Sequence, residues 1–181
     1  MKPDRTSFVI SIMSQDRVGI VHQVASAISQ LDGDIEDIRQ SVLRGYFTMI
    51  LFATFPSGIT AEAVRRTLQE DNDPGDSALE IAIRPALPAP PPAEDSGQVY
   101  VLTASGKDRI GFVATVSSFC VVQNLNILDL STTVAGDEYI MMLMFDVSRC
   151  HNFDALHENL AHFSRETGLN MVLQHDDIFR A

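Results

Sequence analysis

Two short motifs in this chain combine a carboxylate, a guanidinium and a glycine at the same spacing. They are Asp16-Arg17-Val18-Gly19 and Asp108-Arg109-Ile110-Gly111. An alternating apolar run precedes each motif and a run with helical spacing follows it, so each glycine falls where a strand turns sharply into a helix. The N–H groups of a first helical turn, together with the helix dipole, form a small anion site. The carboxylate of an amino acid would suit such a site.

The charged residues of each motif have two possible roles. Asp16 and Asp108 could cap the helix or hold an α-ammonium group, and the residues alone do not choose between these roles. Arg17 and Arg109 could clamp a carboxylate, but a surface ion pair that fixes the loop is the favoured interpretation.

Other reactive side chains do not form a recognisable catalytic or metal pattern. The histidines at 151, 157 and 162 are close in sequence, but helical spacing directs His157 and His162 to different sides of a helix. Cys120 and Cys150 fit no metal spacing, and Cys120 is expected to be a buried thiol. No nucleophile elbow, Walker loop or Rossmann glycine pattern is present. The sequence therefore predicts neither an enzyme nor a bound metal or cofactor.

The two motifs belong to a longer internal repeat. Adding 92 to each residue number places the first motif on the second, and the match continues without a gap to Met49 on Met141. Two copies of one module therefore account for nearly the whole chain. We expect modules at residues 1–84 and 98–181. The segment 85–97 holds five prolines and is expected to be an extended linker.

Hydrophobic periodicity predicts the same order of elements in both modules: strand, helix, strand, strand, helix, strand. In the first module these elements are expected near residues 8–13, 21–31, 35–43, 46–55, 60–70 and 79–83. In the second module they are expected near residues 99–103, 112–122, 125–134, 138–147, 153–167 and 170–174. Thr60 and Asn152 are the expected caps of the second helix of each module. The order βαββαβ predicts an α+β fold of two ferredoxin-like sandwiches in tandem.

The third strand of each module is apolar on both faces. Residues 47–52 and 139–145 lack the alternation expected for a sheet with helices on one side and water on the other. We therefore expect the second face to be covered by the other module or by another subunit.

Composition and charge limit the possible partners. The 181 residues are 45% hydrophobic and 20% charged, which is typical of a globular protein. The formal net charge is −11 and the only lysines are Lys2 and Lys107, which argues against direct binding to nucleic acid. No signal peptide or transmembrane segment is recognisable, so a soluble, cytoplasmic protein without a membrane partner is expected.

Taken together, these residues carry a family resemblance. The pattern of a strand, Asp-Arg-x-Gly, an amphipathic helix and Gly33-Asp34-Ile35-Glu36-Asp37 resembles the ACT domain, an amino-acid-sensing regulatory module. Two such modules with nothing else resemble the glycine cleavage system transcriptional repressor group, and so do residues 35–49 and the tail 174–179. The resemblance covers both halves and excludes only the linker.

The resemblance also implies a binding site. In the ACT family, small ligands lie in the strand-to-helix loop and touch the start of the second strand across an interface. In the first module this implicates Ser14, Asp16, Val18, Gly19 and Asp34. In the second module it implicates Gly106, Asp108, Ile110, Gly111 and Asn126.

The two copies differ at the start of the second strand. An amide at Asn126 is common in family members that bind an amino acid, whereas the carboxylate of Asp34 would repel a ligand carboxylate. This difference favours the second module as the ligand site. His22 could also contact a ligand, but its counterpart is Ala114, so a surface role is favoured.

The expected function is that of a non-catalytic regulatory protein. The resemblance implies that it senses a small amino acid, with glycine as the first candidate, and acts on a partner protein such as a transcription factor or an enzyme. It also implies a homo-oligomer or tightly paired ACT domains. Two alternatives stay open: a ligand-free protein-interaction or oligomerisation module, and an accessory subunit of an amino-acid or one-carbon enzyme.

Overall fold

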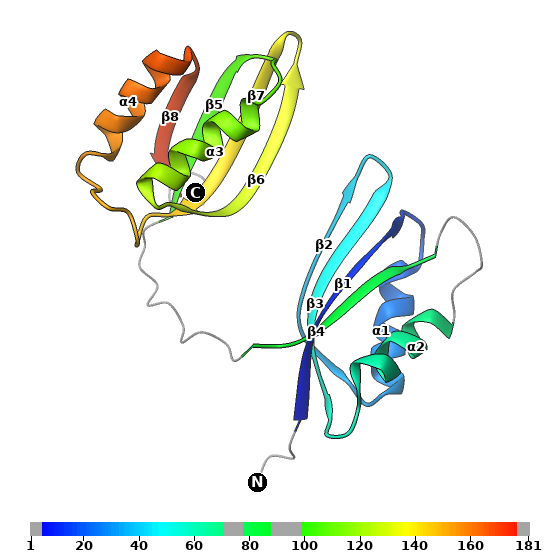
Figure 1. The fold of residues 1–181 in the computed structure, drawn as a ribbon. Helices are drawn as coiled ribbons and strands as arrows, with labels where there is room; N and C mark the ends of the chain where they lie inside the picture. The colour runs from blue at the N-terminus through cyan, green and yellow to red at the C-terminus, as the bar shows by residue number, and fades with distance from the viewer. Residues whose placement is uncertain (1–4, 71–77, 88–98, 177–181) are drawn as a thin grey trace. The chain divides into compact units, whose positions relative to one another are not determined.

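The computed structural model describes residues 5–70, 78–87 and 99–176 (Figure 1). The chain divides into two compact units, Met1–Pro90 and Pro91–Ala181, and each is a four-stranded antiparallel sheet with two helices. Pro85, the first residue of the predicted linker, is the last residue of a strand, while residues 88–97 lie outside the described residues.

The first unit has the predicted βαββαβ order. Its elements are β1 (Arg5–Gln15), α1 (Ile20–Gln30), β2 (Asp34–Leu43), β3 (Tyr46–Pro56), α2 (Ala61–Glu70) and β4 (Glu80–Pro85). The sheet order is β2-β3-β1-β4, and α1 and α2 pack on one face of this sheet. The hairpin between β2 and β3 turns at Arg44 and Gly45, both with positive φ, as a two-residue hairpin of the primed type requires.

The second unit repeats this arrangement. Its elements are β5 (Val99–Lys107), α3 (Phe112–Gln123), β6 (Asn126–Ala135), β7 (Glu138–Asp146), α4 (Leu156–Thr167) and β8 (Asn170–His175). The sheet order is β6-β7-β5-β8, with α3 and α4 on one face. The tandem ferredoxin-like fold expected from the sequence is therefore confirmed.

Two details of the helix ends test the predicted caps. Thr60 caps α2 as expected, because its hydroxyl accepts a hydrogen bond of 3.2 Å from the Ala63 N–H. The predicted cap at Asn152 lies one turn too early: its side-chain oxygen accepts from the Ala155 N–H at 3.1 Å, and α4 begins only at Leu156. Asn152 therefore stabilises the turn that leads into the helix.

Each unit has its own apolar core between the sheet and the helices. In the first unit, alternate residues of β1 (Phe8, Ile10 and Ile12) pack with Val24 and Ile28 of α1. This alternation and the helical spacing are the patterns from which the elements were predicted.

The core of the second unit contains Cys120, which is 1% exposed. Its burial confirms the predicted buried thiol and raises the pKa of that thiol to about 11. Among the described residues, no helix is long and apolar enough to cross a membrane.

The face of each sheet that its own helices leave open carries apolar side chains from the third strand. Ile50 on β3 and Met142 on β7 are 50% and 39% exposed. The structure thus places apolar side chains on this face, as the missing alternation predicted.

Candidate functional site

The strand-to-helix turn is built in the same way in both modules. Gly19 has φ 95° and ψ −4°, and Gly111 has φ 85° and ψ 7°; each directly precedes a helix. A Cβ atom on either glycine would meet no atom within 4 Å. Glycine is therefore favoured at both positions by its backbone conformation and not by lack of space.

The first turn of each helix has no side-chain cap. The first helical hydrogen bonds are from the Gln23 N–H to the Gly19 carbonyl at 2.9 Å and from the Thr115 N–H to the Gly111 carbonyl at 2.8 Å. Neither Asp16 nor the aspartate at 108 caps its helix, so the capping role expected as one possibility is wrong for both aspartates. Before these bonds, the Phe112 N–H donates to the Arg109 carbonyl at 3.3 Å. The other N–H groups of each first turn have no helical partner and can bind an anion.

In each module, the hairpin between the second and third strands is hydrogen-bonded to the strand-to-helix loop. The Asp16 N–H donates to the Gly45 carbonyl at 2.8 Å, and the Asp108 N–H donates to the Asp137 carbonyl at 3.2 Å. These equivalent bonds fix the backbone of both aspartates while their side chains stay exposed. The carboxylates are therefore positioned by the fold and are accessible to a ligand.

In the part of the chain that the structure describes, the two arginines do not form the ion pairs that were expected to fix the loops. Within the described residues, the Arg17 guanidinium donates to the side-chain oxygen of Gln23, and the Arg109 guanidinium donates to the Thr167 carbonyl at 3.2 Å. Both arginines thus tie the loop to a helix through neutral acceptors. The acceptor of Arg109 lies at the end of α4, so this loop is also anchored to the second helix of its module.

A groove lies beside the loop of the first module, between α1 and the edge strand β2. Its volume is about 600 Å³. The lining residues come from the loop, the first two turns of α1, β2 and β3: Asp16, Arg17, Gly19, Ile20, Val21, His22, Ala25, Gln40, Val42 and Phe47. The groove thus joins a carboxylate, a guanidinium and an open helix N-terminus to an apolar wall.

The expected site residues of the first module do not all meet in this groove. Asp16 and Gly19 line it, but Ser14 and Val18 do not. Ser14 is buried, and its hydroxyl donates to the Gln15 carbonyl at 2.9 Å. Val18 is fully exposed at the tip of the loop, as is its counterpart Ile110.

Gly106, the counterpart of Ser14, lies against the second core. A Cβ atom at this position would come within 2.8 Å of the Leu169 side chain. Gly106 therefore has a packing role at the end of β5, where its hydrogen atom leaves room for leucine.

Asp34 and Asn126 lie far from the loops of their own modules. Asp34 opens β2 and pairs with Thr54, whereas Leu43, at the other end of β2, pairs with Tyr46, opposite the end of β1. A strand of ten residues spans roughly 30 Å. Asn126 has the same position at the start of β6. Neither residue can contact a ligand in its own module's loop.

Sequence reasoning did not identify the wall of the groove. Gln40 and Val42 belong to an edge strand that is exposed on both faces, so no burial pattern marks them. Val21 is 46% exposed although it lies within an apolar helical pattern, so the pattern indicated burial and not a place in the groove. His22, considered as a possible contact, lines the groove and lies 3.5 Å from the Ser26 hydroxyl.

No group of three or more His, Cys, Asp or Glu side chains in the described parts of the chain could hold a metal ion. The His162 imidazole lies 3.6 Å from the Glu166 carboxylate, one turn further along α4. This pairing places the imidazole at the helix surface.

Comparison with known protein families agrees with the duplicated fold. The family model for the ACT domain matches residues 6–78 and again residues 98–174. The chain belongs to the ACT domain family. The ACT domain is a regulatory, ligand-sensing fold, and here two copies of it lie in one chain.

Two relatives each match a stretch of this chain that is about as long as one ACT domain. UPF0237 protein MK1213 of Methanopyrus kandleri is 38% identical over 82 residues, which make up 45% of this chain and 91% of that protein. UPF0237 protein lmo0533 of Listeria monocytogenes is 37% identical over 82 residues, or 45% of this chain and 92% of that protein. These relatives therefore have the length of a single module.

Two crystal structures share the tandem arrangement of elements. A protein of unknown function from Galdieria sulphuraria has a TM-score of 0.72 with 24% identity, covering 94% of this chain and 98% of that one. A candidate glycine cleavage system transcriptional repressor has a TM-score of 0.65 with 17% identity, covering 94% of this chain and 96% of that one. At these identities the likeness concerns the fold.

Proposed function

We propose that this tandem ACT-domain protein is a non-catalytic regulator that binds a small amino acid and responds by changing its contact with a partner protein. The observation that carries the proposal is the groove beside α1. It brings together an uncapped helix N-terminus opened by Gly19, the carboxylate of Asp16 and an apolar wall. A free amino acid carries the three complementary groups.

Each part of the ligand has a suitable surface in this groove. The α-carboxylate would accept hydrogen bonds from the first-turn N–H groups of α1 and from Arg17, which exchanges its bond to Gln23 for a charged one. The α-ammonium would lie against Asp16. A short side chain would cover Val21 and Val42.

Glycine is the first ligand to test, because a candidate glycine cleavage system repressor shares the tandem fold. The groove also suggests comparing glycine with amino acids that have an aliphatic side chain. Glycine has no side chain to cover Val21 and Val42, so alanine or valine would bury more apolar surface than glycine would. A series of aliphatic amino acids therefore tests how far the apolar wall contributes.

The second module repeats the loop and is proposed as a second site. Its Asp108, Ile110 and Gly111 have the same turn geometry as the first copy. Asn126 and Asp34 would take part only if the start of a second strand from another module reached the loop. In that arrangement the amide of Asn126 suits a ligand carboxylate better than Asp34 does.

The proposed output is a protein contact in the cytoplasm. With a net charge of −11, the chain is poorly suited to grip a nucleic acid, so any effect on transcription would pass through a partner protein. The alternative is a ligand-free interaction module, and the exposed apolar side chains on the open sheet faces favour it as the second candidate.

A thermal-unfolding screen of the full chain against the twenty amino acids tests the proposal. A ligand at 100 times its dissociation constant adds about 2.7 kcal/mol to stability. We expect a response to one or a few small amino acids that Asp16→Ala removes. Asp108→Ala is the matched control for the first module, and a response lost only in this variant would move the site to the second module. No response to any amino acid would favour the ligand-free module.

A further inference from the structure

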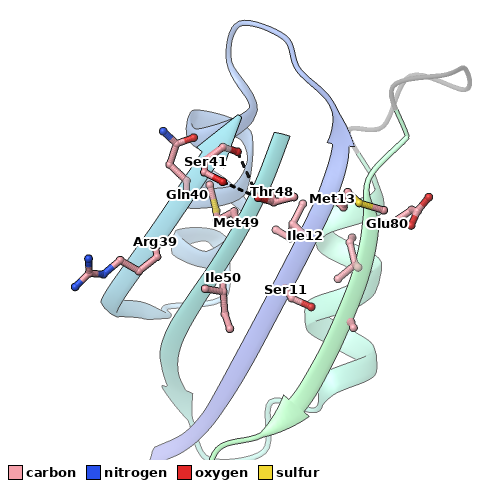
Figure 2. A pocket seen from close by; sticks show the side chains of 12 residues that line it. Ser11, Ile12, Met13, Arg39, Gln40, Ser41, Thr48, Met49, Ile50 and Glu80 are labelled. Atoms are coloured by element: carbon pink, nitrogen blue, oxygen red, sulfur yellow. Dashed lines mark hydrogen bonds between the residues drawn. The ribbon is translucent and has the colours of Figure 1, made fainter. Parts of the chain in front are cut away.

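A second hollow of the first module lies on the face of its sheet opposite the helices (Figure 2). Its volume is about 630 Å³. The side chains that reach it from this face come from all four strands, as Figure 2 shows, with α1 and α2 behind the sheet. This hollow lies on the other side of the sheet from the groove beside α1, and Gln40 of the edge strand β2 lines both.

The centre of this open face is apolar. Met13 on β1 and Ile50 on β3 are 41% and 50% exposed and line the hollow. The hydroxyl groups of Ser41 and Thr48, 3.2 Å apart, satisfy each other. The face therefore presents exposed apolar surface beside a pair of hydroxyl groups that bond each other, a composition found at protein contact surfaces.

The edges of the same face carry charges in a regular order. Strand pairing places Asp37, Phe52, Val9 and Arg84 in one row across the sheet. The next row is Arg39, Ile50, Ser11 and Ala82, and the third is Ser41, Thr48, Met13 and Glu80. The β2 edge thus presents Asp37 and then Arg39, while the β4 edge presents Arg84 and then Glu80.

None of these four charged side chains forms an ion pair within the described residues. Figure 2 shows Arg39 and Glu80 extending from opposite edges of the sheet, away from its apolar centre. An apolar centre with a charged rim is the usual composition of a specific interface. The order of the four charges along the two edges then determines which partner surface has opposite charges in matching positions.

We propose that this face packs against the same face of a second copy of the chain, related by a two-fold axis parallel to the strands. Such an axis reverses the strand order, so β2 of one copy lies opposite β4 of the other. Asp37 of each copy then faces Arg84 of the other in the same row. The Asp37–Arg84 contact is therefore made twice, as expected for an interface in which both copies use the same surface.

The remaining rows fit the same arrangement. Arg39 lies opposite Ala82 of the second copy, and its long side chain reaches Glu80 one row further on. In the centre, β3 lies over β1, so Ile50 faces Ser11 and Phe52 faces Val9. Each of the larger side chains meets a smaller one, which is how facing sheets interdigitate.

The second module lacks this charge pattern. At the positions that match the first module's Asp37, Arg39, Glu80 and Arg84 it has Asp129, Ser131, Asn170 and Gln174. With one charge among these four positions, the second module cannot form the Asp37–Arg84 type of pair with its own copy. The charge pattern therefore favours pairing of the first module with the first module of the other copy. Charges at the rim of an interface fix the orientation of the partners more than they raise the affinity.

Sedimentation equilibrium of the full chain tests this interface by a charge swap. We expect a dimer for the native protein. Asp37→Arg or Arg84→Asp alone should raise the dissociation constant about tenfold, because each replaces two symmetry-related attractions by two repulsions. The double variant, which restores both pairs, should return close to the native value. Asp129→Arg is the matched control at the equivalent position of the second module and should have no effect.

A substitution in the centre gives an independent measurement. Ile50 is half exposed, so Ile50→Lys should leave the module folded, as circular dichroism can verify, and should abolish the dimer. Met142→Lys, the equivalent change in the second module, should leave it intact. A native chain that is monomeric at every concentration overturns the proposal. A dimer that ignores the charge swap, or that only Met142→Lys dissociates, also overturns it.

Discussion

Replacing Gly19 by alanine tests the turn that opens the candidate ligand groove. The φ angle of 95° is strained for any residue with a Cβ atom, at a cost of about 1–2 kcal/mol. No clash adds to this cost, because a Cβ atom would meet nothing within 4 Å. Alanine also restricts the unfolded chain, which returns about 0.4–1 kcal/mol. The net expected destabilisation is therefore about 1 kcal/mol.

Urea unfolding followed by circular dichroism measures this difference in the free energy of unfolding. Gly19→Asn is the matched variant, because asparagine adopts positive φ more readily than alanine. We expect Gly19→Asn to cost less than Gly19→Ala, and we expect Gly19→Ala also to weaken any amino-acid response. Equal stability of the alanine variant and the native protein would refute the strain argument. An asparagine variant as unstable as the alanine variant would point to a lost contact instead.

Three further outcomes follow from packing and burial. Gly33→Ala should cost about 1–3 kcal/mol in urea unfolding, because its Cβ atom would lie 2.6 Å from the Phe55 ring. Burial raises the pKa of the Cys120 thiol from 9.0 to about 11. Because the thiol of the unfolded chain ionises first, the free energy of unfolding should fall as the pH rises between these values. The Cys120→Ala variant should lack this part of the pH profile. A thiol reagent should label half-buried Cys150 before Cys120 in the native protein, and equal rates would contradict the burial of Cys120.

The fold was predictable because its signals are local and occur twice. Alternating residues such as Phe8, Ile10 and Ile12 mark a strand within a few positions. The sharp turn at Gly19 could be located because a strand pattern and a helix pattern meet there, and the structure gives this residue a φ of 95°. The start of α4 was less predictable because Asn152 caps the turn that precedes the helix. Asparagine is favoured both at such turns and at helix N-caps, so the residue type does not distinguish them.

The site was less predictable because its geometry depends on residues far apart in the chain. Arg109 bonds a carbonyl 58 residues away, and no local pattern announces that contact. Val42 forms part of the groove only because β2 lies at the sheet edge beside α1. Asp34 was included through the family resemblance, which places it across an interface and not in its own module's loop.

The proposed ligand groove and the proposed dimer face share strands β2 and β3, and the loop of the groove directly follows β1, which predicts that the two surfaces are coupled. Met13 lines the open face, and Asp16 lines the groove three residues further along the chain. A ligand that moves the end of β1 would therefore change both surfaces. Because coupling is reciprocal, the factor by which an amino acid changes the dimer dissociation constant must equal the factor by which dimerisation changes ligand affinity. Sedimentation with and without the ligand gives the first factor, and titration of native and Ile50→Lys protein gives the second. A measurable ligand affinity with both factors equal to one would mean that the two surfaces act independently.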